Sequence, residues 1–314
     1  MRIVFWGTPE FALPSLRALL GEGHDVVAVV TQPDRPAGRL RELRSPPVKE
    51  VALAEDIPVA QPERARGPEF TEWLAGHAAE LNVVVAYGQI LKREIIDSAT
   101  LGSINVHASL LPELRGAAPI NWAIARGHDT TGITIMRMDE RLDAGPIILQ
   151  VPEPIGADET ATELASRLSE IGAAALIEAL ALMQMGAIPE TPQDDERATL
   201  APRIRREDAR IDWNRTATEV GCHIRAFDNW PGAWTQSPDA EIKMFRPRPE
   251  PDHAHDARPG TVLDLAAADP AHGIRIACGQ GAVWIREVQP SGSRRMRTSD
   301  WLRGRPIEPG ALFG

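Results

Sequence analysis

Asn105 and His107 are the two residues of this sequence whose types and spacing best fit catalysis. They lie two positions apart in an apolar run, residues 102–107, which is predicted to form a β-strand, so both side chains project from one face. A carboxamide beside an imidazole can donate hydrogen bonds to a carbonyl oxygen as negative charge grows on it, and the imidazole can also transfer a proton. The pair therefore indicates chemistry at a carbonyl carbon, although Asn and His in a strand more often have structural roles.

The residues that follow this strand favour a catalytic role. Residues 109–112 leave the strand through a rigid turn, and residues 115–119 supply small side chains where another group can approach the backbone closely. A second predicted strand, residues 132–138, ends in a turn that contains Asp143. A carboxylate there can reach a neighbouring imidazole and keep it protonated and oriented. We select Asp143 as the partner of His107, although an Asp before Ala-Gly-Pro is also a common turn former.

Apolar strands that alternate with helices must position these side chains. Runs at residues 2–6, 26–30, 81–87 and 102–107 predict strands, and apolar residues at helical spacing lie between the runs. This alternation predicts a parallel sheet covered on both faces. Ligands of such sheets bind at the carboxyl ends of the strands, so the loops that follow Tyr87 and His107 are the expected site.

The C-terminal third has a different pattern. A long helix is expected from Thr160 to Met185, with a capping box at Thr160 and Glu163, and a polar connector follows it. Beyond the connector, short extended segments separated by Gly and Pro turns are typical of a small β-barrel. The predicted fold class is α/β. A Rossmann-like, mostly parallel sheet domain spans residues 1–204, and a smaller OB-like β-barrel domain spans residues 205–314.

Composition narrows the function classes. The 314 residues, 43% of them hydrophobic, form a globular chain long enough for two domains, and a net charge of −10 argues against non-specific coating of nucleic acid. Two cysteines without a C-x-x-C pair exclude a disulfide framework and a thiolate zinc site. The loop at residues 7–11 lacks the glycines of a dinucleotide fingerprint, which argues against a nicotinamide or flavin enzyme. The N-terminal apolar run is too short for a signal peptide, so a cytoplasmic protein without a membrane span is expected.

Several of these stretches resemble a known family. Residues 105–112, 115–120 and 138–145 closely resemble the signature of the tetrahydrofolate-dependent formyltransferases, and residues 31–39 and 210–213 are similar to the methionyl-tRNA formyltransferases among them. The resemblance spans essentially the whole chain. It implies a catalytic set of Asn105, His107 and Asp143, 10-formyltetrahydrofolate as cosubstrate, and transfer of its formyl group to the α-amino group of methionine on initiator tRNA, for translation initiation. It implies no metal, no membrane and a monomer.

The resemblance also implies binding residues. Folate is expected along two loops and the backbone of a third, namely Ser109, Leu110, Leu111 and Pro112, Gly88, Gln89, Ile90 and Leu91, and Asp139 and Glu140. The tRNA is expected to contact a locally cationic loop of an acidic domain and the start of the second domain, at Arg35, Arg39, Arg41, Arg44, Arg203 and Arg206. Isolated arginines of this kind are also common on solvated surfaces.

Three other functions use the same residues. Formyl transfer to a small amine would share Asn105, His107 and Asp143, but a small amine needs neither a cationic loop nor a barrel. Hydrolysis of formyltetrahydrofolate would require the amine pocket to be replaced. A non-catalytic RNA-binding protein is disfavoured by the intact trio. An activity assay with each acceptor separates these hypotheses.

Overall fold

The chain divides into two compact units. The computed structural model describes residues 1–37, 42–237, 240–266, 273–304 and 307–314. The first unit comprises Met1–Pro119, Thr131–Glu153 and Ala165–Pro202, and the second comprises Ile120–Thr130, Pro154–Leu164 and Arg203–Gly314. The chain therefore passes back and forth between the two units, and it enters the second unit for the last time after Pro202. The single division after residue 204 stays a prediction.

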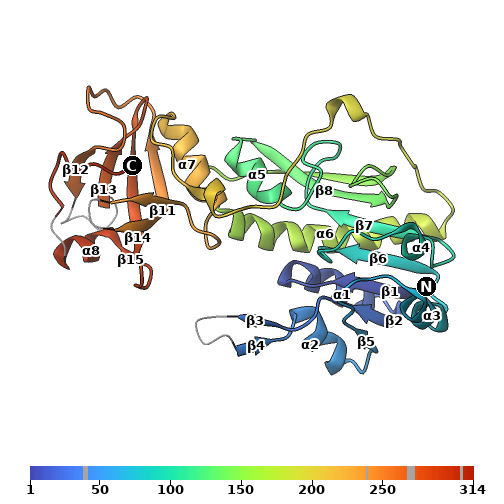
Figure 1. Cartoon of the computed structure of the whole chain (residues 1–314). Coiled ribbons are helices and arrows are strands. Elements are labelled where there is room, and N and C mark those ends of the chain that lie inside the picture. The colour runs from blue at the N-terminus through green and yellow to red at the C-terminus, as the bar shows by residue number, and fades with distance from the viewer. Residues whose placement is uncertain (38–41, 238–239, 267–272, 305–306) are drawn as a thin grey trace. The chain divides into compact units, whose positions relative to one another are not determined.

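A seven-stranded sheet forms the centre of the first unit (Figure 1). Its order is β5-β2-β1-β6-β7-β8-β9, in which β1, β2, β5, β6 and β7 are parallel to their neighbours and β8 is antiparallel to β7. The strands are β1 (Arg2–Gly7), β2 (Asp25–Val30), β5 (Val59–Ala60), β6 (Leu81–Val85), β7 (Ser103–His107), β8 (Thr130–Arg137) and β9 (Ile147–Pro154). The predicted mostly parallel sheet is confirmed.

Helices and 3-10 turns cover this sheet. They are η1 (Glu10–Ala12), α1 (Leu13–Gly21), α2 (Pro47–Ala54), α3 (Pro68–Gly76), α4 (Arg93–Ile96), α6 (Ala161–Gln184) and η2 (Asp195–Arg197). Val4 and Trp6, on one face of β1, pack in a cluster with Leu74 of α3. Ile3 and Phe5, on the other face of the strand, are also fully buried. Burial on both faces explains why these strands read as continuous apolar runs.

The long helix α6 packs directly against the strands of interest. A Cβ added at Gly172 would lie 3.1 Å from Cγ1 of Val106 in β7, so the helix approaches that strand closely. Thr160 and Glu163 form the expected capping box, in which each residue's backbone N–H donates to the other's side chain. None of the helices in the described ranges is both long and apolar enough to cross a membrane.

The second unit contains an antiparallel sheet. Its order is β10-β11-β14-β13-β12, with β15 paired to β14, as expected for the short extended segments. The strands are β10 (Trp234–Gln236), β11 (Glu241–Glu250), β12 (Val262–Ala266), β13 (Gly273–Ala277), β14 (Ala282–Pro290) and β15 (Met296–Arg297). The helical segments are α5 (Pro119–Ala125), η3 (Glu207–Ala209), α7 (Ala217–Ala226) and α8 (Thr298–Gly304). A Cβ at Gly221 would lie 2.5 Å from Cγ of Pro249, so α7 packs tightly on β11.

The carboxyl ends of β1, β2 and β6 meet where the strand order reverses. Thr8, just after β1, donates its hydroxyl hydrogen to the carbonyl oxygen of Tyr87, just after β6, at 3.0 Å. Gln32, after β2, donates to the same oxygen at 3.2 Å. Ligands of doubly wound sheets bind at such a reversal, so the loop after β6 lies where a ligand is expected.

Candidate active site

Strand β7 presents Asn105 and His107 at its carboxyl end. Both side chains are nearly buried, with exposed fractions of 9% and 5%. Nε2 of His107 lies 3.0 Å from the carbonyl oxygen of Leu114. Because a carbonyl oxygen can only accept, this contact assigns a proton to Nε2 and leaves Nδ1 as the nitrogen available for chemistry.

Asp143 lies beside that second nitrogen. Its Oδ2 is 3.8 Å from Nδ1 of His107, within ion-pair range but beyond hydrogen-bond distance. The same oxygen accepts a hydrogen bond from the backbone N–H of Gly116 at 2.8 Å. The structure therefore brings Asp143 and His107 together, and it leaves Nδ1 without a hydrogen bond to any described residue.

Gly116 allows this arrangement through its backbone. Its φ of 123° lies in the region that favours glycine, and an added Cβ would be 2.6 Å from the carbonyl oxygen of Ala201. The small residue thus permits one backbone to pass another while its N–H holds Asp143. This is the close approach that the small residues at 115–119 were expected to allow.

The Asn105 carboxamide has no hydrogen-bond partner among the described residues, and its exposed fraction of 9% leaves a narrow approach to it. Buried carboxamides are normally hydrogen-bonded. An unpartnered carboxamide next to an imidazole therefore fits a bound carbonyl group better than it fits a purely structural role.

The loop after β7 is held by its own polar contacts. Ser109 is fully buried and donates its hydroxyl hydrogen to the Glu113 carbonyl at 2.7 Å. Thr134 of β8 donates to the Ser109 carbonyl and accepts from the Leu111 N–H. Leu111 and Pro112 are buried, with a cis peptide bond between them, and Leu110 is half-buried. The side chains are thus occupied in building the loop, and backbone groups are what it can offer a ligand.

The loop after β6 divides its residues between core and surface. Leu91 packs into the core cluster of Trp6 and Tyr87, and Gly88 adopts a φ of 92°. Gln89 accepts from the Ala65 N–H and donates to the Glu63 carbonyl. Ile90 is 75% exposed. Four residues of this loop are expected at the folate, and among them only Ile90 has a side chain that is free to contact it.

Asp139 and Glu140 lie in the turn after β8. The Asp139 carboxylate accepts a hydrogen bond from the backbone N–H of Arg141 at 2.8 Å and also contacts its guanidinium, while Glu140 is exposed. The side chain of Asp139 is thus engaged within its own turn. Only backbone contacts of this turn match the expected role at a pterin edge.

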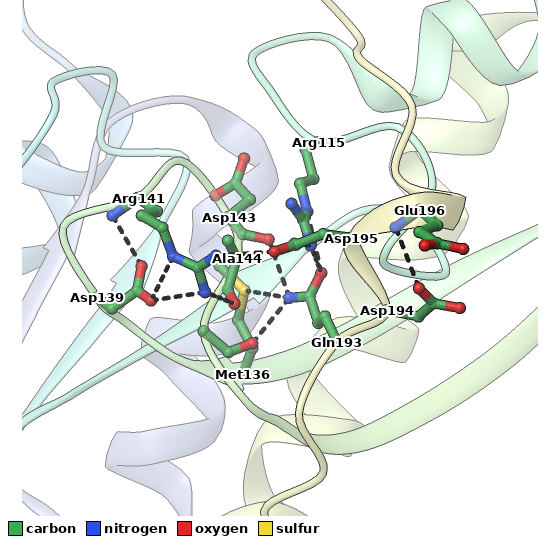
Figure 2. Close-up of polar contacts among 11 residues, drawn as sticks. Arg115, Met136, Asp139, Arg141, Asp143, Ala144, Gln193, Asp194, Asp195 and Glu196 are labelled. Atoms are coloured by element: carbon green, nitrogen blue, oxygen red, sulfur yellow. Dashed lines mark hydrogen bonds and ion pairs between the residues drawn. The ribbon is translucent and has the colours of Figure 1, made fainter.

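A polar network joins this turn to residues that the sequence analysis missed (Figure 2). Arg115 is 8% exposed and donates to Gln193 and to Asp195. Asp195 also accepts from Arg141 at 3.0 Å. Hydrogen bonds from Arg115, and then from Arg141, hold the pKa of Asp195 below its usual range. Gln193 and Asp195 read as an ordinary polar connector in the sequence, and only their pairing with a distant loop distinguishes them.

The candidate tRNA-binding arginines lie at separate places. Arg35 belongs to β3 (Arg35–Ala37) and Arg44 to β4 (Glu42–Arg44), a two-stranded sheet of the first unit. Arg39 and Arg41 lie outside the described residues. Arg203 and Arg206 are exposed in the second unit, where the Arg206 guanidinium lies 4.9 Å from the ring centroid of Trp234. In the described part of the chain, no group of three His, Cys, Asp or Glu residues could hold a metal ion.

Comparison with known proteins identifies relatives along the full length. The formyl transferase pattern matches residues 1–180, and the pattern of the formyl transferase C-terminal domain matches residues 203–306. A methionyl-tRNA formyltransferase from Symbiobacterium thermophilum is 47% identical over 313 residues, covering 100% of this chain and 95% of the relative. Another, from Citrifermentans bemidjiense, is 45% identical over 314 residues, covering 100% and 96%.

Solved structures share the fold at lower identity. WlaRD, a sugar 3N-formyl transferase crystallised with dTDP and 5-N-formyl-THF, gives a TM-score of 0.69 at 18% identity and covers 94% of this chain and 99% of its own. HypX from Aquifex aeolicus, in complex with tetrahydrofolic acid, gives a TM-score of 0.65 at 20% identity and covers 100% of this chain and 50% of its own. At such identities the likeness shows the fold alone.

Proposed function

Because this chain belongs to the methionyl-tRNA formyltransferase family of the formyl transferases, we propose that it transfers the formyl group of 10-formyltetrahydrofolate to the α-amino group of methionine on initiator tRNA. The observation that supports this chemistry is the unpartnered Asn105 carboxamide beside the His107–Asp143 pair. The folate supplies an activated formyl carbon. No metal is needed for the transfer.

The geometry of the side chains supports the following catalytic roles. Asn105 and Nδ1 of His107 donate hydrogen bonds to the formyl oxygen as negative charge grows on it. One such donor typically contributes about 3–4 kcal/mol of barrier lowering. Oδ2 of Asp143, which accepts from the Gly116 N–H, lies 3.8 Å from Nδ1 of His107 and stabilises positive charge there. The other carboxylate oxygen of Asp143 has no hydrogen bond among the described residues. Through a water, that oxygen helps move the proton that the attacking amine loses to the departing folate nitrogen, as the bond between this nitrogen and the formyl carbon breaks.

We place the folate on the loop after β7, the loop after β6 and the backbone of the turn after β8. The buried Ser109, Leu111 and Pro112 shape the first loop, and its backbone groups provide polar contacts. We assign residues 205–314 to tRNA binding, with Arg203 just before that part and Arg206 at its start. A monomer acting in the cytoplasm, where translation begins, completes the proposal.

The two-stranded sheet of β3 and β4 is proposed to bind tRNA phosphates. Arg35 and Arg44 are directly opposite each other in its register. Arg35 pairs with Glu63 at 2.9 Å, whereas Arg44 has no ion pair with a described residue, so Arg44 is the arginine with a charge available to a phosphate. Asp34, directly before β3, accepts hydrogen bonds from Gln61 and Lys49, which fix the start of the sheet. These hydrogen bonds hold the pKa of Asp34 below its usual range.

Replacing Arg44 by alanine is expected to raise the KM for methionyl-tRNA several-fold while kcat at saturating tRNA stays unchanged. Losing one phosphate contact should also lower the slope of log(kcat/KM) against log salt by about 1. Steady-state formylation at several salt concentrations measures both quantities. Arg93→Ala, which removes an exposed arginine paired with Asp97 on α4, serves as the control. Equal KM values for the two variants would contradict the proposed contact.

The function is tested by incubating the protein with 10-formyltetrahydrofolate and methionine-charged initiator tRNA, and measuring formylmethionine after mild hydrolysis. Uncharged tRNA, a free amine and buffer alone are the parallel acceptors. We expect formylation of the charged tRNA only. Folate turnover with a free amine would favour a small-amine transferase, and turnover in buffer alone would favour a hydrolase.

A further inference from the structure

The connector, defined here as residues 191–201, forms part of the candidate active site. Its backbone pairs with the loop that contains Gly116: the Arg115 N–H donates to the Thr199 carbonyl at 2.9 Å, and the Ala201 N–H donates to the Arg115 carbonyl at 2.7 Å. Its first residue pairs with Ile147 at the start of β9 through two backbone bonds of 2.8 and 2.9 Å. The connector is therefore fixed on both sides of the turn that contains Asp143.

Gln193 uses its carboxamide fully in this region. Its Oε1 accepts from Nε of Arg115 at 3.0 Å and from Nη2 of the same guanidinium at 2.8 Å. Arginine can only donate, so this contact fixes which end of the carboxamide is oxygen. Nε2 then donates to the carbonyl oxygens of Asp143 at 2.9 Å and Gly145 at 2.8 Å. One side chain thus ties the buried Arg115 to the turn that contains Asp143, as Figure 2 shows.

The turn needs such a tie. Asp143 has a φ of 48°, a left-handed conformation that costs a non-glycine residue free energy and persists only when its surroundings hold it. Two positions further along, Gly145 lies so close to the backbone of Arg137 that an added Cβ would be 2.0 Å from the Arg137 carbonyl oxygen. Arg141 fixes the intervening Ala144 carbonyl at 3.2 Å while it pairs with Asp195. Three consecutive carbonyls of the turn are therefore held, two of them by Gln193.

We infer that Gln193 is a positioning residue for formyl transfer, which sets the carboxylate of Asp143 against His107 by holding the backbone of its turn. This inference rests on the proposed function. Gln193 makes no hydrogen bond to His107 or Asn105 among the described residues. Its Nε2 bonds to the carbonyls of Asp143 and Gly145 and lies 3.9 Å from Sδ of Met136, so its main hold is on the turn that contains Asp143. A misplacement of about 1 Å in a catalytic group can cost 10²-fold in rate, so loss of this tie should reduce turnover without altering substrate binding.

Gln193→Glu is the test variant. It keeps the size of the side chain and an oxygen for Arg115, but it replaces the N–H donors to the two carbonyls by a second oxygen. We expect kcat for methionyl-tRNA formylation to fall by about 10- to 100-fold, with both KM values unchanged. Gln184→Glu, the same change at the exposed end of α6, should retain wild-type kcat.

A double-mutant cycle with Asp143→Asn separates positioning from general destabilisation. If Gln193 acts through Asp143, Gln193→Glu should cause no further loss of kcat in the Asp143→Asn background. Multiplying losses, or a wild-type kcat for the single variant, would overturn the inference. If Gln193→Glu does not fold, Gln193→Ala takes its place in the same cycle.

Hydrogen exchange gives a readout that does not depend on the reaction. Amides of residues 139–145 should exchange faster in Gln193→Glu than in Gln184→Glu, because the turn loses its tie. Unchanged exchange would overturn the inference whatever the substrate is. If the wild-type protein fails to formylate methionyl-tRNA, but the amides of Gln193→Glu still exchange faster than those of Gln184→Glu, the proposed function is overturned. The role of Gln193 in holding the turn would then still stand.

Discussion

Replacing His107 by alanine is expected to lower kcat for formylation by about 10²–10³-fold or more, because a donor to the formyl oxygen disappears from a nearly buried site. The loss should fall on kcat, since the charge on the oxygen develops only as the amine attacks. The KM for either substrate should change little. Single-turnover formylation measures the chemical step directly.

The same substitution removes the partner of a buried carbonyl. Without Nε2, the Leu114 carbonyl oxygen is left unsatisfied, which costs about 1–3 kcal/mol of stability. The free energy of unfolding should fall by that amount and leave a folded protein at 25 °C. Asn82→Ala, which removes buried hydrogen bonds to Trp6 and Ser103, controls for this cost and should keep its turnover. A His107→Ala enzyme within tenfold of wild type would contradict the catalytic role.

Replacing Asp143 by asparagine is expected to lower kcat by about 10²–10⁴-fold, the range typical of lost acid–base participation. The substitution is nearly isosteric and keeps an oxygen to accept the Gly116 N–H. It removes the charge that faces Nδ1 of His107 at 3.8 Å. Geometry is thereby largely preserved while the electrostatic contribution is lost. Steady-state kinetics with both substrates varied will show whether kcat alone responds.

Asp97→Asn is the matched control for this change. Asp97 lies next to α4, exposed and paired with Arg93, so it loses the same charge without touching the catalytic loops. Its kcat should equal that of the wild type. If Asp143→Asn retained more than a tenth of wild-type turnover, Asp143 would be a turn-forming residue and not a partner of His107.

Local patterns in the sequence were sufficient to predict the sheet and the pair on β7. Parallel strands buried on both faces leave continuous apolar runs, and the two-residue period of a strand places Asn105 and His107 on one face. The capping box at Thr160 and Glu163 predicted the start of α6, because its bonds join residues three apart. Each of these features depends on neighbours in the chain.

Features that depend on distant pairing were not predictable in this way. The connector reads as polar and proline-rich, yet Ala201 bonds to Arg115, 86 positions earlier, and Gln193 bonds to Asp143, 50 positions earlier. The sequence predicts a loop for the cationic stretch that contains Arg35 and Arg44, whereas the described part of this stretch contains the paired strands β3 and β4. No short-range pattern in the sequence records such contacts.

The path of the connector bears on how this enzyme can exchange parts with its relatives. A junction placed at the end of α6 divides the chain where the last long helix stops, but it gives Gln193, Asp195 and Ala201 to the incoming partner. These residues make backbone and side-chain contacts with the turn of Asp143 and the loop of Gly116. A chimera that keeps its native catalytic unit must therefore be joined after Pro202. The segment that must come from one parent therefore extends past α6 to Pro202. Recombination inside the connector would separate its residues from the Asp143 turn and the Gly116 loop that they contact.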